Sequence, residues 1–265
     1  MAKLAAEIAP PSAFLLALES RGFFGVAQLI AGAPFLAMAP RGTPQAVIVL
    51  PGLGATDRST VAIRHYLKLL GYQATGWNRG RNVRPAGADL PAVAAQICSL
   101  SDVTGMPVSL VGWSRGGLIA REAARLAPEA TRMVMTLGSP FAAPGASNAG
   151  AVWRRLTGEA FPEYTQERLH ALAAPLPFPS TSIYSRSDGV VAWRACRQTE
   201  GHQSENVEVR GSHIGLGFNP AAFWVIADRL AQPLGAWTPF RPSPLIARFF
   251  PRSEELYSRQ SRPHT

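Results

Sequence analysis

A serine flanked by glycines is the first feature that suggests catalysis. The segment Gly112-Trp113-Ser114-Arg115-Gly116 matches the pattern G-x-S-x-G, and Gly117 follows it. It lies between an apolar, β-branched run and a stretch with helical spacing, which places the serine at a strand-to-helix turn. Such a turn holds the serine in a strained conformation that leaves no room for side chains two residues away. The pattern predicts that Ser114 is a nucleophile.

A serine nucleophile needs a base, and the base needs a carboxylate that orients it. At a turn of this type the acid and then the histidine follow the serine along the chain. His213 has that order and lies in a loop of small residues, Gly211–Gly217, after an apolar run. Asp188 follows an earlier strand-like run, among polar and small neighbours. We therefore expect His213 to be the base and Asp188 the acid.

The developing oxyanion needs backbone donors, each typically worth about 10²–10³ in turnover. One is expected to be the N–H of Arg115, directly after the nucleophile, and the other the N–H of Leu53 in the loop Pro51-Gly52-Leu53-Gly54. Trp113 and Phe141 are candidates for lining a substrate pocket. The alternative for Trp113 is packing beside the turn, and the alternative for Phe141 is a cap that covers its own apolar face.

From residue 46 onward, short apolar runs alternate with helical stretches. This alternation predicts a mostly parallel, doubly wound α/β sheet with helices on both faces. Strands are expected at 47–50, 72–76, 108–111, 133–137, 182–185 and 207–209, and helices at 59–70, 88–99, from 115 onward and at 220–231.

The chain divides into three expected parts. Residues 1–45 form an apolar helical segment packed on the core, residues 46–238 the α/β domain, and residues 239–265 a tail rich in proline and arginine. An insertion at about 141–180 is too long for a plain connection and predicts a small cap. Its helical pieces are expected at 149–158 and 163–174.

The amino-terminal part leaves several alternatives open. Residues 22–40 are uncharged and approach the length of a membrane span, and Ala37-Met38-Ala39 resembles a signal-peptide cleavage site. Internal glycines and prolines, with Glu19 and Arg21 just before the stretch, weigh against a span. Glu7 beside Lys3 in the amino-terminal region, and Pro40 directly after the cut, weigh against a signal peptide. Apolar helices on the core are favoured, and peripheral contact with a membrane is a further alternative. Localisation stays open, with cytoplasmic as the default and membrane-associated or exported as alternatives.

Composition excludes several classes of protein. The 265 residues are 47% hydrophobic and 16% charged, which is not the composition of a disordered chain. The net charge of +9 comes from scattered arginines without a basic tract, so no nucleic-acid partner is expected. Cys98 and Cys196 lack metal-site spacing, so we expect two free thiols and no metal.

The sequence resembles an α/β-hydrolase of the bacterial carboxylesterase/lipase type. The resemblance rests on PGLGATDRST, GWSRGG, TLGSPF, SRSDGVV and GSHIGLG, across about residues 46–232. It implies the doubly wound sheet with a small helical cap, and hydrolysis of a small-molecule or lipid ester through an acyl-serine intermediate without a cofactor. The nucleophile, base, acid and two oxyanion-hole amides would be Ser114, His213, Asp188, Leu53 and Arg115.

Two other hypotheses for the function of the same residues stay open. An acyltransferase or an amidase would use the same serine, histidine and aspartate with a different acceptor or leaving group. A non-catalytic protein that binds lipid surfaces on a hydrolase scaffold is disfavoured, because every catalytic position is filled.

Overall fold

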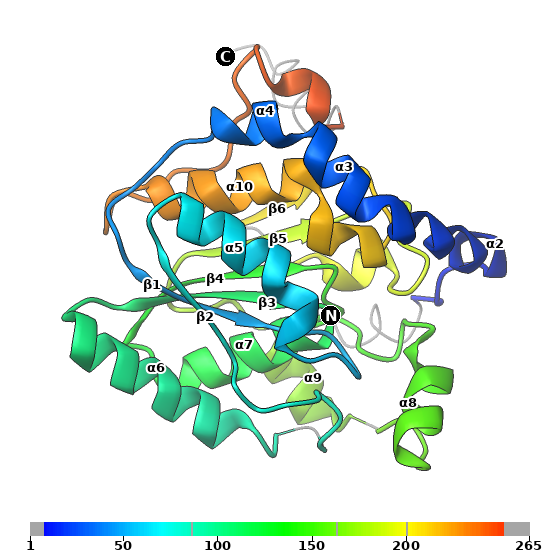
Figure 1. Ribbon diagram of the computed structural model, residues 1–265. Helices are drawn as coiled ribbons and strands as arrows, with labels where there is room; N and C mark the ends of the chain where they lie inside the picture. The colour runs from blue at the N-terminus through cyan, green and yellow to red at the C-terminus, as the bar shows by residue number, and fades with distance from the viewer. Residues whose placement is uncertain (1–7, 86, 163, 200, 252–265) are drawn as a thin grey trace, which may run out of the picture.

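A single parallel sheet organises the fold (Figure 1). The computed structural model describes residues 8–85, 87–162, 164–199 and 201–251. In this part of the chain six strands pair in the order β2-β1-β3-β4-β5-β6, all parallel. The strands are β1 Ala46–Leu50, β2 Gln73–Gly76, β3 Val108–Trp113, β4 Thr131–Leu137, β5 Ser180–Tyr184 and β6 Ser204–Glu208.

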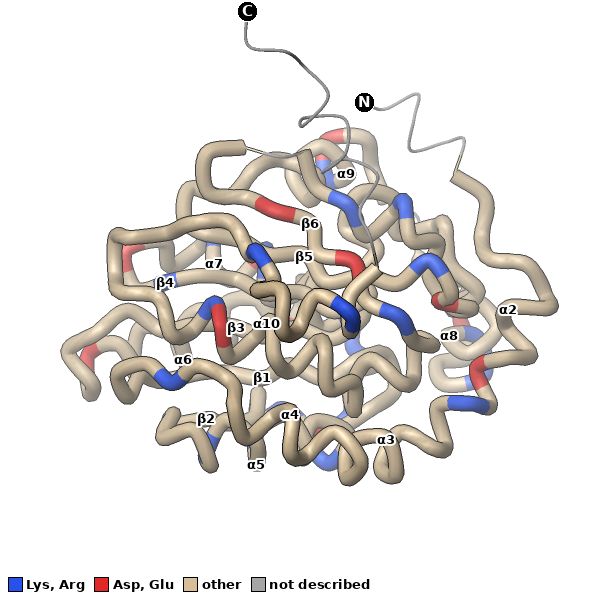
Figure 2. Tube along the Cα trace, turned by 90° about the horizontal axis from the view of Figure 1, so that it is seen from above, with Lys and Arg blue, Asp and Glu red and all other residues tan. Residues whose placement is uncertain are grey.

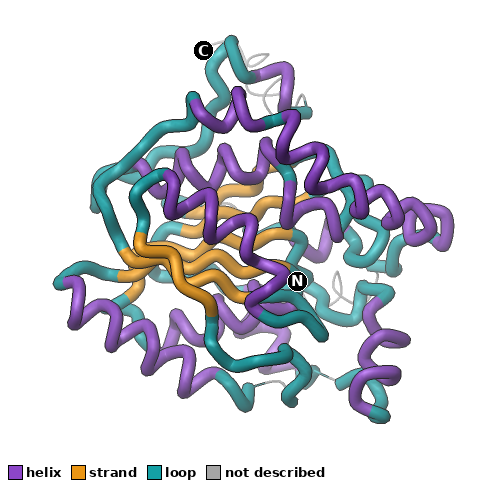
Figure 3. The backbone as a smooth tube through the Cα atoms, in the orientation of Figure 1, coloured by secondary structure: helices purple, strands orange, loops and turns teal. Residues whose placement is uncertain are grey.

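Helices cover both faces of the sheet, as Figures 1 and 3 show. One face packs against α5 (Val61–Leu69) and α10 (Pro220–Ala231). The other packs against α6 (Leu90–Thr104) and α7 (Arg115–Leu126). Side chains along β1 alternate between the two cores because successive residues of a strand point to opposite faces. The predicted fold class is confirmed, and all six strands and four helices lie where the periodicity placed them, with ends shifted by a few residues.

Local signals explain where individual helices begin and end. The Asn219 side chain accepts a hydrogen bond from the N–H of Ala222 at 3.1 Å, and Pro220 opens α10. Gly105, with a φ of 66°, ends α6 in the left-handed conformation that glycine tolerates best. Most of α10 is buried, which accounts for its nearly continuous apolar sequence.

Two helices, α8 (Ala149–Thr157) and α9 (Gln166–Ala173), lie between β4 and β5. Both predicted helical pieces are therefore present, with slightly shorter bounds. Arg121 of α7 is buried and donates to the carbonyl groups of Leu172 and Ala174 at 3.3 and 3.0 Å, which ties α9 to the domain. Burial lowers the pKa of Arg121 to about 9.

The amino-terminal segment is a series of short helices that runs past α10 (Figure 1). By length and composition the helical stretch Ala13–Ala31 could cross a membrane. Its inner side nevertheless packs on the protein: a Cβ on Gly22 would lie 2.6 Å from the Cβ of Ile214, and one on Gly25 would lie 3.0 Å from Phe218. The helices are α2 Ala13–Ala17, η1 Leu18–Phe24, α3 Gly25–Ala31 and α4 Ala33–Ala37, and η4 Ile214–Phe218 lies beneath them.

The last described residues pack next to α4. The ring of Phe249 in η5 (Ala247–Phe249) contacts that of Phe35 with centroids 4.4 Å apart. Residues 1–7 and 252–265, which belong to the expected first and third parts, lie outside the described residues. Cys98 is exposed and Cys196 is buried, and both are free thiols as predicted.

Candidate active site

Ser114 lies at the turn from β3 into α7 in a conformation that non-glycine residues rarely adopt. Its φ is 54° and its ψ is −125°. A Cβ on Gly112 would collide with the backbone of Gly117, and one on Gly116 would lie 2.5 Å from the carbonyl oxygen of Leu50. The glycines of the motif are therefore required by contacts between β3, α7 and β1, as the sequence predicts.

Asp188 and His213 come together at the ends of the neighbouring strands β5 and β6. The Asp188 Oδ2 and His213 Nδ1 atoms are 2.7 Å apart, and both side chains are buried. Asp188 Oδ1 accepts hydrogen bonds from the N–H groups of Val190 and Val191 at 2.8 and 2.7 Å. The carboxylate is thus held in one orientation, with its second oxygen directed at the imidazole.

The backbone after β4 connects Ser114 with this pair. The N–H of Ser114 donates to the carbonyl of Leu137 at 2.7 Å. A Cβ on the next residue, Gly138, would lie 3.0 Å from His213 Nδ1 and 3.1 Å from Asp188 Oδ2. Ser114 Oγ has no hydrogen-bond partner among the described residues, and bonds between nucleophile and base are often long before substrate binds. His213 therefore contacts Asp188 directly. The backbone of Leu137 and Gly138 lies between this pair and Ser114.

Opposing effects act on the pKa of His213. Burial lowers it, because a buried imidazolium loses hydration. The charge of Asp188, its hydrogen bond and the charge of Glu19 raise the pKa, and together they outweigh burial. The ring therefore holds its second proton to a higher pH than an ordinary histidine, and the free base forms only above that pH.

The loop after β1 lies beside Ser114. A Cβ on Gly52 would lie 3.3 Å from the Cβ of Ser114. In the described part of the chain, the N–H groups of Leu53 and Arg115 have no hydrogen-bond partner, so both predicted donors are available to a substrate oxygen.

Asn82 holds this loop in place. Its side-chain amide donates to the carbonyl of Pro51 at 2.7 Å. Its backbone N–H donates to Ala55, and its carbonyl accepts the N–H of Gly54, both at 2.9 Å. Its Oδ1 accepts a hydrogen bond from the Arg115 guanidinium. Sequence reasoning missed Asn82 because a single asparagine in an arginine-rich loop carries no such signal.

The side chain of Arg115 links the serine turn to the cap. Besides Asn82, its guanidinium donates to the carbonyl of Arg84, and it lies 5.4 Å from the ring centroid of Trp153 in α8. Burial lowers its pKa. The side chain of Leu156 in α8 lies against Gly54, so α8 reaches the oxyanion loop.

The two side chains predicted to line a substrate pocket have other contacts. The Trp113 indole N–H donates to the carbonyl of His213 at 3.2 Å, and its ring packs on Gly217. Phe141 is fully buried, and the Arg121 guanidinium lies 4.1 Å from its ring centroid. Both rings are buried and pack within the protein, and their role in lining a substrate pocket stays a prediction.

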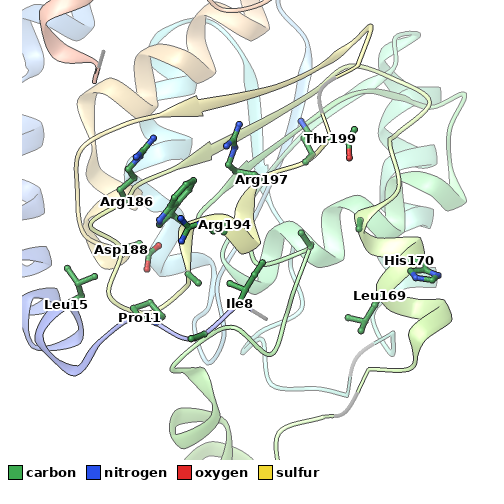
Figure 4. A pocket seen from close by; sticks show the side chains of 16 residues that line it. Ile8, Pro11, Leu15, Leu169, His170, Arg186, Asp188, Arg194, Arg197 and Thr199 are labelled. Carbon is green, nitrogen blue, oxygen red and sulfur yellow. The ribbon is translucent and has the colours of Figure 1, made fainter. Parts of the chain in front are cut away.

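A cavity of about 880 Å³ adjoins the acid side of the site (Figure 4). Asp188 lines it together with apolar side chains that include Leu15 and Leu169. Trp193 and Arg194 also line it, with the Arg194 guanidinium 4.6 Å from the ring centroid. Among the described residues, no group of three or more His, Cys, Asp or Glu side chains is placed to hold a metal ion.

Comparison with known proteins identifies the fold. No protein-family model matches the chain. The structure resembles Aspergillus fumigatus lipase B with a TM-score of 0.55 at 18% identity, over 73% of this chain and 54% of that chain. It resembles Bacillus licheniformis lipase BlEst2 in its mature form with a TM-score of 0.54 at 16% identity, over 74% of this chain and 95% of that chain. The chain has the α/β-hydrolase fold.

Part of the sequence also resembles a much longer protein. It is 34% identical over 127 residues to Polyketide synthase ThaQ of Burkholderia thailandensis. The match covers 39% of this chain and 6% of that protein, so the chain spans a small fraction of this relative's length.

The first prediction concerns the charge of His213. We expect its pKa in the folded protein to lie above the ordinary value of 6.5, because Asp188 and Glu19 stabilise the imidazolium. Asp188→Asn, which removes one of these charges, should lower the pKa. An NMR titration of the histidine ring signals measures both, and a value below 6.5 in the natural chain would contradict the account.

The second prediction concerns Asn82. Asn82→Ala leaves the buried carbonyl of Pro51 without its donor, so the free energy of unfolding should fall by about 1–3 kcal/mol. Urea denaturation measures this. The control is Gln28→Ala, which removes an exposed amide of α3 and should stay within about 0.5 kcal/mol of the natural chain. Equal stability of the two variants would show that Asn82 does not anchor the loop.

Proposed function

We propose that this protein is a serine hydrolase that cleaves carboxylic esters, as an esterase or a lipase. Ser114 is the nucleophile, His213 the base and Asp188 the acid. The observation that carries the proposal is the buried 2.7 Å contact between Asp188 and His213 beside a serine held at a φ of 54°. The likeness to two lipases supports the proposal through fold alone.

Acylation begins with attack of Ser114 Oγ on the ester carbonyl carbon. As the new C–O bond forms, His213 accepts the hydroxyl proton, and the Asp188 carboxylate stabilises the resulting imidazolium. The carbonyl oxygen becomes an oxyanion and is stabilised by the N–H groups of Leu53 and Arg115. The raised pKa of His213 makes it a stronger base for this step.

The tetrahedral intermediate then collapses, and the bond to the alcohol breaks. His213 returns its proton to the leaving alcohol, so an acyl-serine and a neutral imidazole remain. Water attacks the acyl carbon while His213 takes one of its protons. The second collapse releases the carboxylic acid and returns the proton to Ser114 Oγ, which restores the starting state.

A second candidate is transfer of the acyl group to an alcohol or amine instead of water. The same three residues serve this reaction, because only the attacking group of the second half-reaction changes. The observation that favours it is the partial match to Polyketide synthase ThaQ, whose name is that of a synthase and not of a hydrolase.

The test of the proposal is hydrolysis of p-nitrophenyl esters from acetyl to palmitoyl. Ser114→Ala should lower turnover by about 10⁴–10⁶ because the covalent route is lost. The control Ser99→Ala, at an exposed serine of α6, should retain full turnover.

The outcomes separate the candidates. Turnover that is unchanged in Ser114→Ala would contradict the assignment of the nucleophile. Ester or amide products formed from an added alcohol or amine, in preference to hydrolysis, would favour the transfer reaction. The chain length with the highest turnover distinguishes an esterase from a lipase.

We also propose that the amino-terminal helices contact an anionic lipid surface. Their outer side exposes large apolar side chains, among them Phe14, Phe23 and Ile30, which are 71%, 84% and 69% exposed. The one carboxylate within residues 8–45, Glu19, is only 5% exposed, whereas Arg21 is exposed. Figure 2 shows no charged residue along α3 and α4. An apolar face with a cationic flank and no exposed carboxylate suits an anionic bilayer.

Cosedimentation with vesicles of phosphatidylcholine and phosphatidylglycerol tests this contact. The double substitution Phe23→Ser and Phe24→Ser should weaken vesicle binding at least about tenfold, because it removes two exposed apolar rings that would otherwise be buried in the bilayer. The control Val103→Ser, at an equally exposed site on α6, should bind like the natural chain. Absence of vesicle binding, or equal binding of the double variant, would overturn the proposal.

A further inference from the structure

The amino-terminal segment reaches the catalytic loops through one buried side chain, Glu19. Its Oε1 accepts hydrogen bonds from the N–H groups of Gly189 and His213 at 2.7 and 2.8 Å. Its Oε2 accepts the N–H of Ile214 at 2.9 Å. Gly189 directly follows Asp188, so a single carboxylate holds the backbone of both the acid loop and the base loop.

These three hydrogen bonds offset the cost of removing the Glu19 carboxylate from water. A carboxylate removed from water is costly unless donors replace its hydration. Glu19 is 5% exposed and forms no ion pair with any described residue. Its described partners are all backbone N–H groups of the two loops, and hydrogen bonds to an ionised acceptor are stronger than neutral ones.

Further contacts near Glu19 hold the amino-terminal segment against the loop that carries Asp188. A Cβ on Gly189 would collide with the carbonyl of Leu15, so the acid loop and the amino-terminal helices approach each other as backbone. The Asn148 side-chain amide, just before α8, donates to the carbonyl groups of Pro11 and Gly189 at 3.1 and 2.9 Å. The segment is therefore seated on the acid loop at more than one point.

We propose that Glu19 is a positioning residue for the Asp188–His213 pair. It fixes the backbone on which each of the two side chains is carried, and so sets the direction of their hydrogen bond. This role rests on the proposed function, because it concerns the base and acid of that reaction. Glu19 acts through the two loops and makes no contact with the reacting atoms.

The arrangement also has an electrostatic consequence. The charged groups acting on His213 are Asp188 and Glu19, and the charge of each raises the pKa of the imidazole. This effect acts on His213 itself and gives a second readout besides kcat. Loss of the Glu19 charge should therefore lower the pKa of His213, and the acid limb of the pH–rate profile should move to lower pH.

Glu19→Gln is the direct test, because glutamine has the same shape without the charge. Its NH₂ group would face a backbone N–H donor where a carboxylate oxygen now accepts. We expect kcat for a p-nitrophenyl ester to fall about 10-fold to 100-fold with KM changed by less than about twofold. The pKa of His213, followed by NMR and assigned by the signal missing in His213→Asn, should decrease.

Two further variants make the test specific. Glu19→Asp keeps the charge but shortens the reach, so the pKa of His213 should move less than in Glu19→Gln while kcat stays below that of the natural chain. Asp102→Asn removes the charge of an exposed carboxylate on α6 and should leave kcat and the pH–rate profile unchanged. Urea denaturation of each variant reports whether it is folded, and Glu19→Asp carries the test if Glu19→Gln does not fold.

The outcomes distinguish this proposal from the proposed function. Unchanged kcat and an unchanged His213 titration in Glu19→Gln, while Ser114→Ala is inactive, would overturn the role of Glu19 alone. A fall in kcat matched in Asp102→Asn, with no change in the pKa of His213, would also overturn it. If the natural chain hydrolyses no ester, the proposed function fails first and the role of Glu19 fails with it.

Discussion

The turn at Ser114 is the constraint on which the arrangement of the site depends. Its positive φ presents the serine hydroxyl at the carboxyl edge of the sheet, and this is possible only where the surrounding chain carries no side chains. Gly112 and Gly116 therefore pack directly on the backbone of α7 and β1. The same closeness places Gly52, and with it the loop after β1, beside Ser114.

The rest of the site is assembled from loops at that one edge. Parallel strands bring their carboxyl ends together, so β5 and β6 deliver Asp188 and His213 side by side. Two carboxylates then act on one imidazole in different ways: Asp188 bonds to the ring, whereas Glu19 bonds to the backbone that carries it. Asn82 holds the loop after β1 through a hydrogen bond to its backbone, and Glu19 likewise bonds to the backbone of the loops that carry Asp188 and His213. The geometry of the candidate site thus also rests on buried polar side chains besides Ser114, His213 and Asp188.

Much of this could be predicted from sequence, because the informative signals are local. β-Branched runs and helical periodicity predict the strands and helices, and a glycine pattern fixed by sterics marks Ser114. Glu19 could not be found this way, since it lies 170 residues from Gly189 and only tertiary packing brings them together. Position beside a motif does not decide what a ring contacts: the rings of Trp113 and Phe141 are both buried, and their role in lining a pocket stays a prediction.

Covalent labelling with a fluorophosphonate, followed by mass spectrometry of the digested protein, tests directly whether Ser114 is an activated nucleophile. An activated serine oxygen attacks phosphorus and displaces fluoride, which leaves a stable phosphonate ester on that serine. We expect a single adduct, on the peptide that contains Ser114, formed much more slowly in His213→Asn. An unlabelled protein, or an adduct on another residue with Ser114 unmodified, would contradict it.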